Sequence, residues 1–197
     1  MKTIYDFTPD DDEAVLRNAR EHVASAIAGN PAPPPLPPDL AETPVAGIFV
    51  TLKNRGELRS CIGYWNGEPP GPLGPALDRA ARGAATGDPR FPPISLSEIP
   101  ELAVEVSLLA NPRVVETVGE QRAAEVVPGR HGLILEDGFR RGLLLPQVAA
   151  EHGWDARTFL EHTALKAGLP RSAWRDPRTT LTTFEARVLA SPPEPSE

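Results

Sequence analysis

Prolines divide this chain of 197 residues into short segments. Most of the 24 prolines stand at the borders of apolar segments, not inside them. Because proline lacks a backbone N–H and fixes its φ angle, it interrupts helices and strands wherever it does not start or end them. Hydrophobic residues make up 40% of the chain, enough to bury a core in one domain or in one domain with a small second lobe. We therefore predict a folded chain of short elements joined by many loops.

Apolar residues recur at helical spacing in the first segment of the chain and in several later ones. Thr8 can cap a helix that has Pro9 at its first position, and Gly29 can end that helix. The same pattern predicts further helices over residues 73–87, 117–127, 146–153 and 155–168.

The predicted strands are joined by short turns. Residues 45–52 and 57–63 flank one turn, and residues 133–135 and 139–145 flank another, as in antiparallel hairpins. Residues 102–108 alternate between apolar and other side chains, and residues 179–189 have the composition of a last strand. These patterns favour the α+β class, with an antiparallel sheet covered by helices.

The ends of the chain are expected to differ from its centre. We assign residues 1–30 to an N-terminal helix and residues 31–44 to a proline-rich connector within the same domain, and we expect residues 191–197 to be disordered. The run PAPPPLPP at residues 31–38 favours polyproline II, which suits either a stiff spacer or a ligand for a proline-binding module. We prefer the spacer.

Charge and cysteine content argue against several classes of protein. The net charge of −7 argues against a nucleic-acid binder and against a polybasic membrane-surface protein. The acidic N-terminus does not resemble a signal peptide, and no apolar run is long enough to span a bilayer, so a cytoplasmic location is expected. A single cysteine cannot form an intramolecular disulfide or a multi-cysteine metal site, and the four histidines are scattered. We predict neither a metal site nor a cofactor.

Cys61 is the first candidate for chemistry because it is the only thiol. On an extended segment, Arg59 and Cys61 point to the same face, and a nearby cation favours the thiolate. Gly63 follows on that face and is expected to leave room beside the sulfur. The alternative is a buried, inert cysteine, which is common for free thiols.

Five other positions could serve such a site. His131 stands between glycines at the start of a strand and is the best candidate for an acid or base. The turn that contains Asp88 and Arg90 could hold the Arg90 guanidinium in place for an anionic ligand. Alternatively, the two side chains bond to each other and to the local backbone. Gln147 either binds a ligand or bonds to the exposed amides in the first turn of its own helix. Glu105 either faces solvent or lines a cleft.

Eight short segments, in this order along the chain, resemble the AMMECR-one domain family. They are Gly47–Leu52, Leu58–Gly63, Asp88–Pro93, Glu105–Leu109, Gly129–Leu133, Leu144–Val148, Trp154–Asp155 and Lys166–Leu169. The resemblance extends over about residues 10–190. Ser60 stands where the family's Leu-Arg-Gly-Cys-Ile-Gly motif has its first glycine.

The resemblance implies an α+β fold with a larger and a smaller lobe, but no settled activity. It singles out six positions, with Cys61 and His131 as catalytic candidates and Arg59, Asp88, Arg90 and Gln147 as substrate-binding candidates. Bacterial and archaeal members are similar to protein A of the AmmeMemoRadiSam system, whose companions are a Memo-type protein and a radical SAM protein. The resulting hypothesis is a thiol-dependent modification enzyme acting with these partners on an unknown small molecule or protein. The alternative is a non-catalytic ligand-binding or adaptor module.

Overall fold

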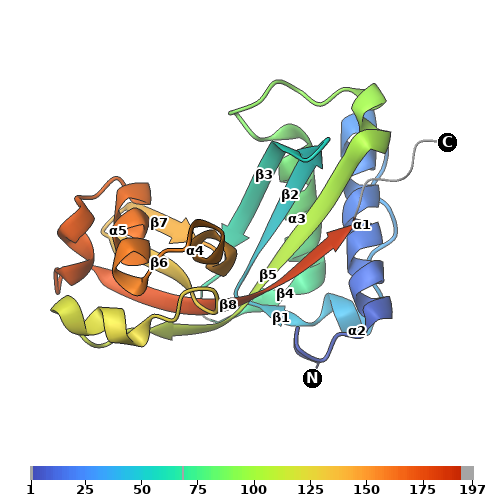
Figure 1. Ribbon diagram of the computed structural model, residues 1–197. Coiled ribbons are helices and arrows are strands. Elements are labelled where there is room, and N and C mark those ends of the chain that lie inside the picture. Colours follow the sequence, from blue (N-terminus) through green and yellow to red (C-terminus); the bar gives the residue numbers. More distant parts are fainter. Residues whose placement is uncertain (1, 68, 192–197) are drawn as a thin grey trace. The chain divides into compact units, whose positions relative to one another are not determined.

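A computed structural model describes residues 2–67 and 69–191 and divides the chain into two compact units (Figure 1). Unit 1 contains the described residues up to Ala110 and from Arg187 onward, and unit 2 contains Asn111–Ala186. Helices accompany antiparallel strands, which confirms the predicted α+β class with a larger and a smaller lobe.

The helices and strands follow one another in short steps. The α-helices are α1 (Pro9–Ala28), α2 (Pro38–Ala41), α3 (Leu73–Thr86), α4 (Pro146–His152) and α5 (Ala156–Lys166). The 3-10 helices are η1 (Leu96–Glu101), η2 (Gly119–Glu125) and η3 (Arg171–Arg175). The strands are β1 (Pro44–Val45), β2 (Gly47–Asn54), β3 (Glu57–Trp65), β4 (Gly71–Pro72), β5 (Leu102–Val114), β6 (Gly132–Asp137), β7 (Arg140–Leu144) and β8 (Thr180–Ser191). Hydrogen-bonded neighbours follow the order β3-β2-β5-β8-β6-β7, and β1 pairs with β4 separately.

Helix α1 begins and ends where the sequence predicts. The Thr8 backbone N–H donates to Asp11 Oδ2 at 2.8 Å, and the Asp11 N–H donates to Thr8 Oγ1 at 3.3 Å. This reciprocal capping box satisfies two N–H groups that a helix start leaves unpaired. Gly29 ends the helix at φ 68°, a left-handed conformation that glycine adopts without cost.

The core of unit 1 lies between helices and a sheet. Helix α3 packs against β2 and β3, and α1 packs beside α3 (Figure 1). The apolar side chains of α3 that face this core are fully or almost fully buried, and they are Leu73, Leu77, Ala80, Ala81, Ala84 and Ala85. Their small size allows the helix to lie close to the strands.

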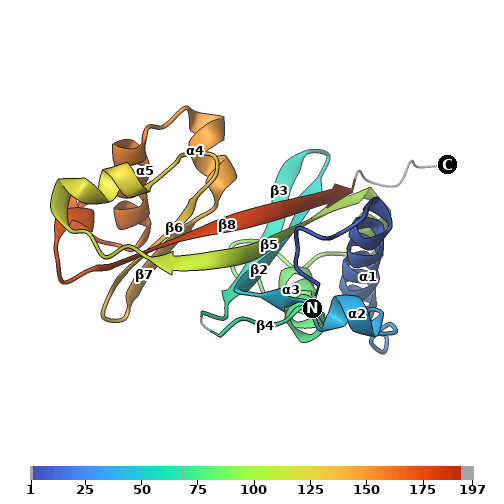
Figure 2. The same ribbon diagram turned by 90° about the horizontal axis from the view of Figure 1, so that it is seen from below.

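Unit 2 has a core of its own, in which α5 packs against β6 and β7 (Figure 2). Phe159 and Trp174 are its largest fully buried side chains that belong to helices. The guanidinium of Arg122 is also buried, and it donates to the carbonyls of Thr117, Trp174 and Thr179. These carbonyl acceptors replace the water that the buried guanidinium loses.

Some predicted boundaries need correction. The first turn is shorter than predicted, because β2 extends to Asn54 and only Arg55 and Gly56 adopt positive φ angles. Phe139 belongs to the second turn and not to a strand, since β7 begins at Arg140. Residues 117–127 contain the 3-10 helix η2 in place of an α-helix. The tail prediction for 192–197 lies outside the described residues, and residue 191 ends β8.

Candidate functional site

Strand β3 presents two different faces. Ser60 is buried toward α3, where its hydroxyl donates to the Ala84 carbonyl at 2.6 Å. Cys61 is the next residue, so its side chain points to the opposite face, and it is half-buried. The serine that departs from the family motif thus stabilises the contact with α3 and does not crowd the thiol.

Polar side chains accompany Cys61 across three strands. The Thr51 hydroxyl on β2 donates to Cys61 Sγ at 3.3 Å. Thr51 is opposite Cys61 on one side and opposite Glu105 of β5 on the other. Glu105 accepts from Lys53 Nζ at 3.1 Å, so this carboxylate has a cation of its own beside it. Cys61, Thr51 and Glu105 are therefore paired neighbours across β3, β2 and β5, so a hydroxyl donor and an ion-paired carboxylate accompany the thiol.

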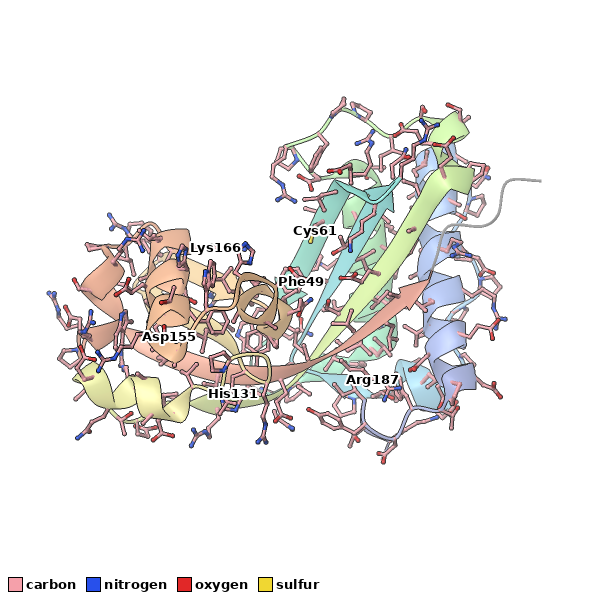
Figure 3. The ribbon with its side chains drawn as sticks, viewed as in Figure 1. Phe49, Cys61, His131, Asp155, Lys166 and Arg187 are labelled. Carbon is pink, nitrogen blue, oxygen red and sulfur yellow. The ribbon has the colours of Figure 1, made fainter. Side chains whose placement is uncertain are left out.

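The space expected beside the sulfur at Gly63 is occupied. A Cβ at Gly63 would lie 2.2 Å from Cδ1 and 2.4 Å from Cγ of Phe49. Phe49 is opposite Gly63 in the β2–β3 register, so its ring fills the position that the glycine leaves open (Figure 3). The prediction of free room at Gly63 is wrong, and the glycine instead admits an aromatic ring.

Asp88 and Arg90 hold the backbone of Cys61. Asp88 Oδ2 accepts from the Cys61 N–H at 2.9 Å, and Arg90 Nη2 donates to the Cys61 carbonyl at 3.1 Å. The two side chains also bond to each other, with Arg90 Nη2 2.7 Å from Asp88 Oδ2. The bonded Arg90 guanidinium, more than the Cys61 amide, holds the pKa of the Asp88 carboxyl well below its usual range. Since β3 is an edge strand, this pair supplies the bonds that a neighbouring strand would otherwise make.

Arg59 is bonded to η1 and to the loop between α3 and η1. Its Nε donates to Glu98 Oε2 at 2.7 Å, and its Nη1 and Nη2 donate to the carbonyls of Pro92 at 3.0 Å and Pro93 at 3.1 Å. The Arg59 guanidinium in turn lowers the pKa of Glu98 to about 2. The effect of Arg59 on the thiol stays a prediction, because these hydrogen bonds direct the guanidinium to η1 and the loop before it.

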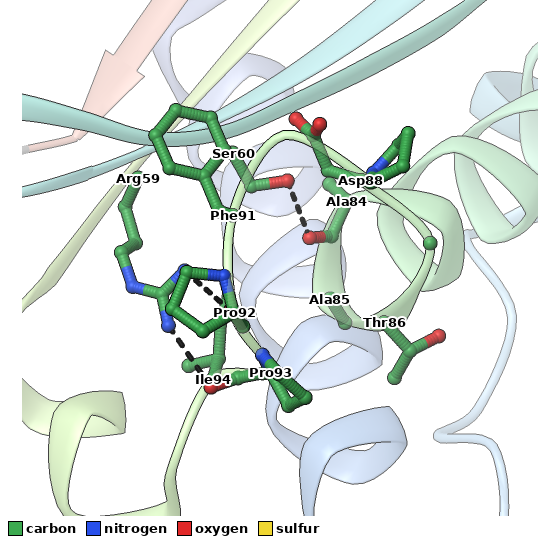
Figure 4. A pocket seen from close by; sticks show the side chains of 12 residues that line it. Arg59, Ser60, Ala84, Ala85, Thr86, Asp88, Phe91, Pro92, Pro93 and Ile94 are labelled. Atoms are coloured by element: carbon green, nitrogen blue, oxygen red, sulfur yellow. Dashed lines mark hydrogen bonds between the residues drawn. The ribbon is translucent and has the colours of Figure 1, made fainter.

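A cavity of about 330 Å³ lies between this loop and the end of α3 (Figure 4). Two predicted substrate-binding residues, Arg59 and Asp88, line it. Sequence patterns assigned no binding role to its other lining residues, which are Ser60, Ala84, Ala85, Thr86, Gly87, Pro89, Phe91, Pro92, Pro93 and Ile94. Its walls combine alanine and proline surfaces with one aromatic ring and two charged groups, a composition suited to a small ligand.

The remaining two predicted site residues belong to unit 2. His131 lines a separate cavity of about 200 Å³, and its Nδ1 accepts from the Val127 N–H at 3.1 Å. Gln147 is the second residue of α4, is half-buried, and does not line that cavity. The structure therefore groups Arg59, Cys61, Asp88 and Arg90 in unit 1.

Within residues 2–67 and 69–191, no three side chains of histidine, cysteine, aspartate or glutamate come together as a metal ion requires. None of the helices there combines the length and the apolar character needed to cross a bilayer.

The fold and the Cys61 site define a two-unit α+β protein with a single thiol on an edge strand. The AMMECR1 family model matches residues 16–189, and the chain belongs to that family. A protein of Methanothermobacter thermautotrophicus is 49% identical over 144 residues, which are 73% of this chain and 74% of that protein. Protein MK0488 of Methanopyrus kandleri is 43% identical over a segment that covers 92% of this chain and 89% of that protein. The crystal structure of the uncharacterized protein PH0010 from Pyrococcus horikoshii matches with a TM-score of 0.79 and 41% identity over 88% of each chain.

Proposed function

We propose that the protein is a thiol-dependent group-transfer enzyme in which Cys61 is the nucleophile. The observation that carries the proposal is the Asp88–Arg90 pair, which bonds to both backbone groups of Cys61. A nucleophile must be held in a fixed position relative to its substrate, and this pair fixes the strand at the thiol. The Thr51 hydroxyl supports the same role because it donates to the sulfur.

The proposed reaction has two steps and involves no oxidation. Cys61 Sγ forms a bond to an electrophilic carbon of the transferred group as the bond to the leaving group breaks. The leaving group takes the bonding electrons and the thiol proton. An acceptor then attacks the same carbon, its proton returns to the sulfur, and the free thiol is restored. The cavity lined by Arg59 and Asp88 is the proposed binding site for part of the substrate.

The proposed step assigns no proton transfer to His131, which belongs to unit 2 and whose Nδ1 accepts from the Val127 N–H. We further propose, from the family resemblance alone, that a Memo-type protein and a radical SAM protein act with this chain.

The alkylation rate of Cys61 tests the proposal, since the chain has one cysteine and every adduct reports on it. We expect iodoacetamide to alkylate the folded protein at pH 7 faster than it alkylates free cysteine. Thr51→Val keeps the side-chain shape but removes the hydroxyl, and it should slow alkylation about threefold or more. Thr180→Val, at an exposed position of β8, should leave the rate unchanged.

Two outcomes would contradict the proposal. One is a thiol that reacts only after unfolding in urea. The other is a Cys61→Ser strain whose metabolites and protein modifications match those of the wild type and differ from those of a deletion strain.

A binding or adaptor module is the second candidate function. It is favoured by the internal partners of both guanidinium groups, because Arg59 bonds to Glu98 and Arg90 bonds to Asp88. In that case Cys61→Ser keeps the companion proteins bound during co-purification, whereas Arg90→Ala weakens their retention.

A further inference from the structure

Unit 2 contains a cavity that the Cys61 proposal does not use. Its volume is about 200 Å³, and the residues around it include Arg113, Arg130, His131 and Glu185. Three of these four side chains carry nitrogen donors, and all four belong to the same compact unit.

An aromatic ring, Phe184, lines this cavity and packs on a glycine. A Cβ at Gly132 would lie 2.2 Å from Cζ of Phe184, which is opposite it in the β6–β8 register. The ring therefore lies directly on the glycine backbone, one residue after His131. This packing explains why glycine follows the histidine in the sequence.

His131 lines this cavity with its imidazole ring. Burial, followed by the nearby Arg130 guanidinium, lowers the pKa of His131, while Glu185 and a hydrogen bond to the Glu125 backbone oppose that effect and Arg113 adds to it. The neutral imidazole is thus the main form at neutral pH.

The two arginines retain donors for a ligand. Arg130 uses Nε for its 2.7 Å bond to Glu185, and Arg113 uses Nη2 for its 2.7 Å bond to Glu125. A guanidinium has five N–H donors, so each of these bonds engages only part of the group. Both side chains are more than half exposed, at 68% for Arg130 and 59% for Arg113.

We propose that this cavity binds the phosphate group of a small soluble molecule. Two guanidinium groups with donors to spare suit the three or more oxygens and the higher negative charge of a phosphate better than the two oxygens and single charge of a carboxylate. Glu185 is the opposing charge, and it accepts hydrogen bonds from Arg130 and from Asn111, whose Nδ2 lies 2.9 Å from its Oε2. The proposal is independent of Cys61 and of the reaction assigned to it.

Titration of the full-length protein with inorganic phosphate tests the site, with acetate as the carboxylate probe. Binding is followed by calorimetry and by the NMR signals of the His131 ring. We expect saturable binding of phosphate that is tighter than binding of acetate, together with a rise in the His131 pKa as the anion approaches. Arg130→Ala should weaken phosphate binding about tenfold.

Two further variants separate binding from loss of structure. Glu185→Gln removes the competing negative charge at nearly constant shape, so phosphate should bind about threefold more tightly. Arg157→Ala removes a guanidinium of similar exposure, 63%, that pairs with Glu120 on the surface of α5, and it should leave the affinity unchanged. The proposal is overturned if phosphate does not bind, if acetate binds as tightly, if Glu185→Gln weakens binding, or if Arg157→Ala weakens it as much as Arg130→Ala.

Discussion

A single carboxylate organises the candidate site at the scale of residues. Asp88 accepts from the Cys61 amide and from Arg90, and its side chain is only 3% exposed. The two-residue spacing of Asp88 and Arg90 indicated from sequence that they could pair. Their contact with Cys61 could not be predicted, because it joins a loop to a strand edge across 27 positions. Local spacing reveals a pair in a turn, whereas the strand that the pair covers depends on the tertiary fold.

Replacing Asp88 tests this arrangement through the pH dependence of stability. The pKa of Asp88 is lowered from 3.8 in the folded protein, so its stabilising effect is fully present above that value and is lost as the pH falls further. We expect Asp88→Asn to reduce the free energy of unfolding by about 2 kcal/mol at pH 7, because charge-assisted bonds are lost. Urea denaturation should show this difference shrinking below pH 4. Exposed Glu151→Gln serves as the control, and a difference that persists unchanged at pH 3 would contradict the mechanism.

At the scale of elements, the strand pairings of the hairpins were predictable, whereas the packing of side chains on them was not. Both predicted hairpins are present because their signals are local, with turn residues between two apolar runs. The packing of distant residues on these strands was not predictable in the same way. Phe49 over Gly63 reverses the expectation of open space, since a glycine has the same sequence signature whether its neighbour is solvent or a ring. Strand β5 also continues six residues beyond its predicted end at 108, to Val114.

A glycine on β7 fixes how closely helix α5 approaches the strand. A Cβ at Gly142 would lie 2.5 Å from the Ala167 backbone N and 2.5 Å from the Thr163 carbonyl O. Because both are backbone atoms at the end of a helix, they cannot rotate away as a flexible side chain can. We expect Gly142→Ala to lower the free energy of unfolding by about 2 kcal/mol or more.

A second glycine provides the control for this measurement. Gly71→Ala meets only the side chain of Asn66, with Nδ2 at 3.3 Å, and this side chain can move. Its cost in urea denaturation should be well below that of Gly142→Ala. Equal costs would show that close approach to the α5 backbone is not what requires the glycine.

At the scale of the whole molecule, the last strand contacts the segment around the start of the first helix. Arg187, on the last strand, donates to the Ile4 carbonyl at 3.1 Å, to the Phe7 carbonyl at 3.3 Å and to Asp12 Oδ2 at 2.6 Å. All of these residues belong to unit 1, which therefore contains both the first helix and the end of β8. Sequence patterns predicted the helix and the strand separately. No periodicity joins positions 175 residues apart, so this contact could not be predicted.

The contact between Arg187 and Asp12 predicts coupled effects on stability. Removing the guanidinium leaves Asp12 without that partner, and Asp12 Oδ1 is buried and has no hydrogen bond within the described residues. We expect Arg187→Ala alone to cost about 2 kcal/mol, since two carbonyls also lose a donor. In a double-mutant cycle with Asp12→Ala, the coupling energy from urea denaturation should be about 1 kcal/mol. Asp10→Ala, two positions away on the exposed side of α1, should add to Arg187→Ala without coupling. Additive effects of Arg187→Ala and Asp12→Ala would mean that the carbonyl contacts alone join the two ends of the chain.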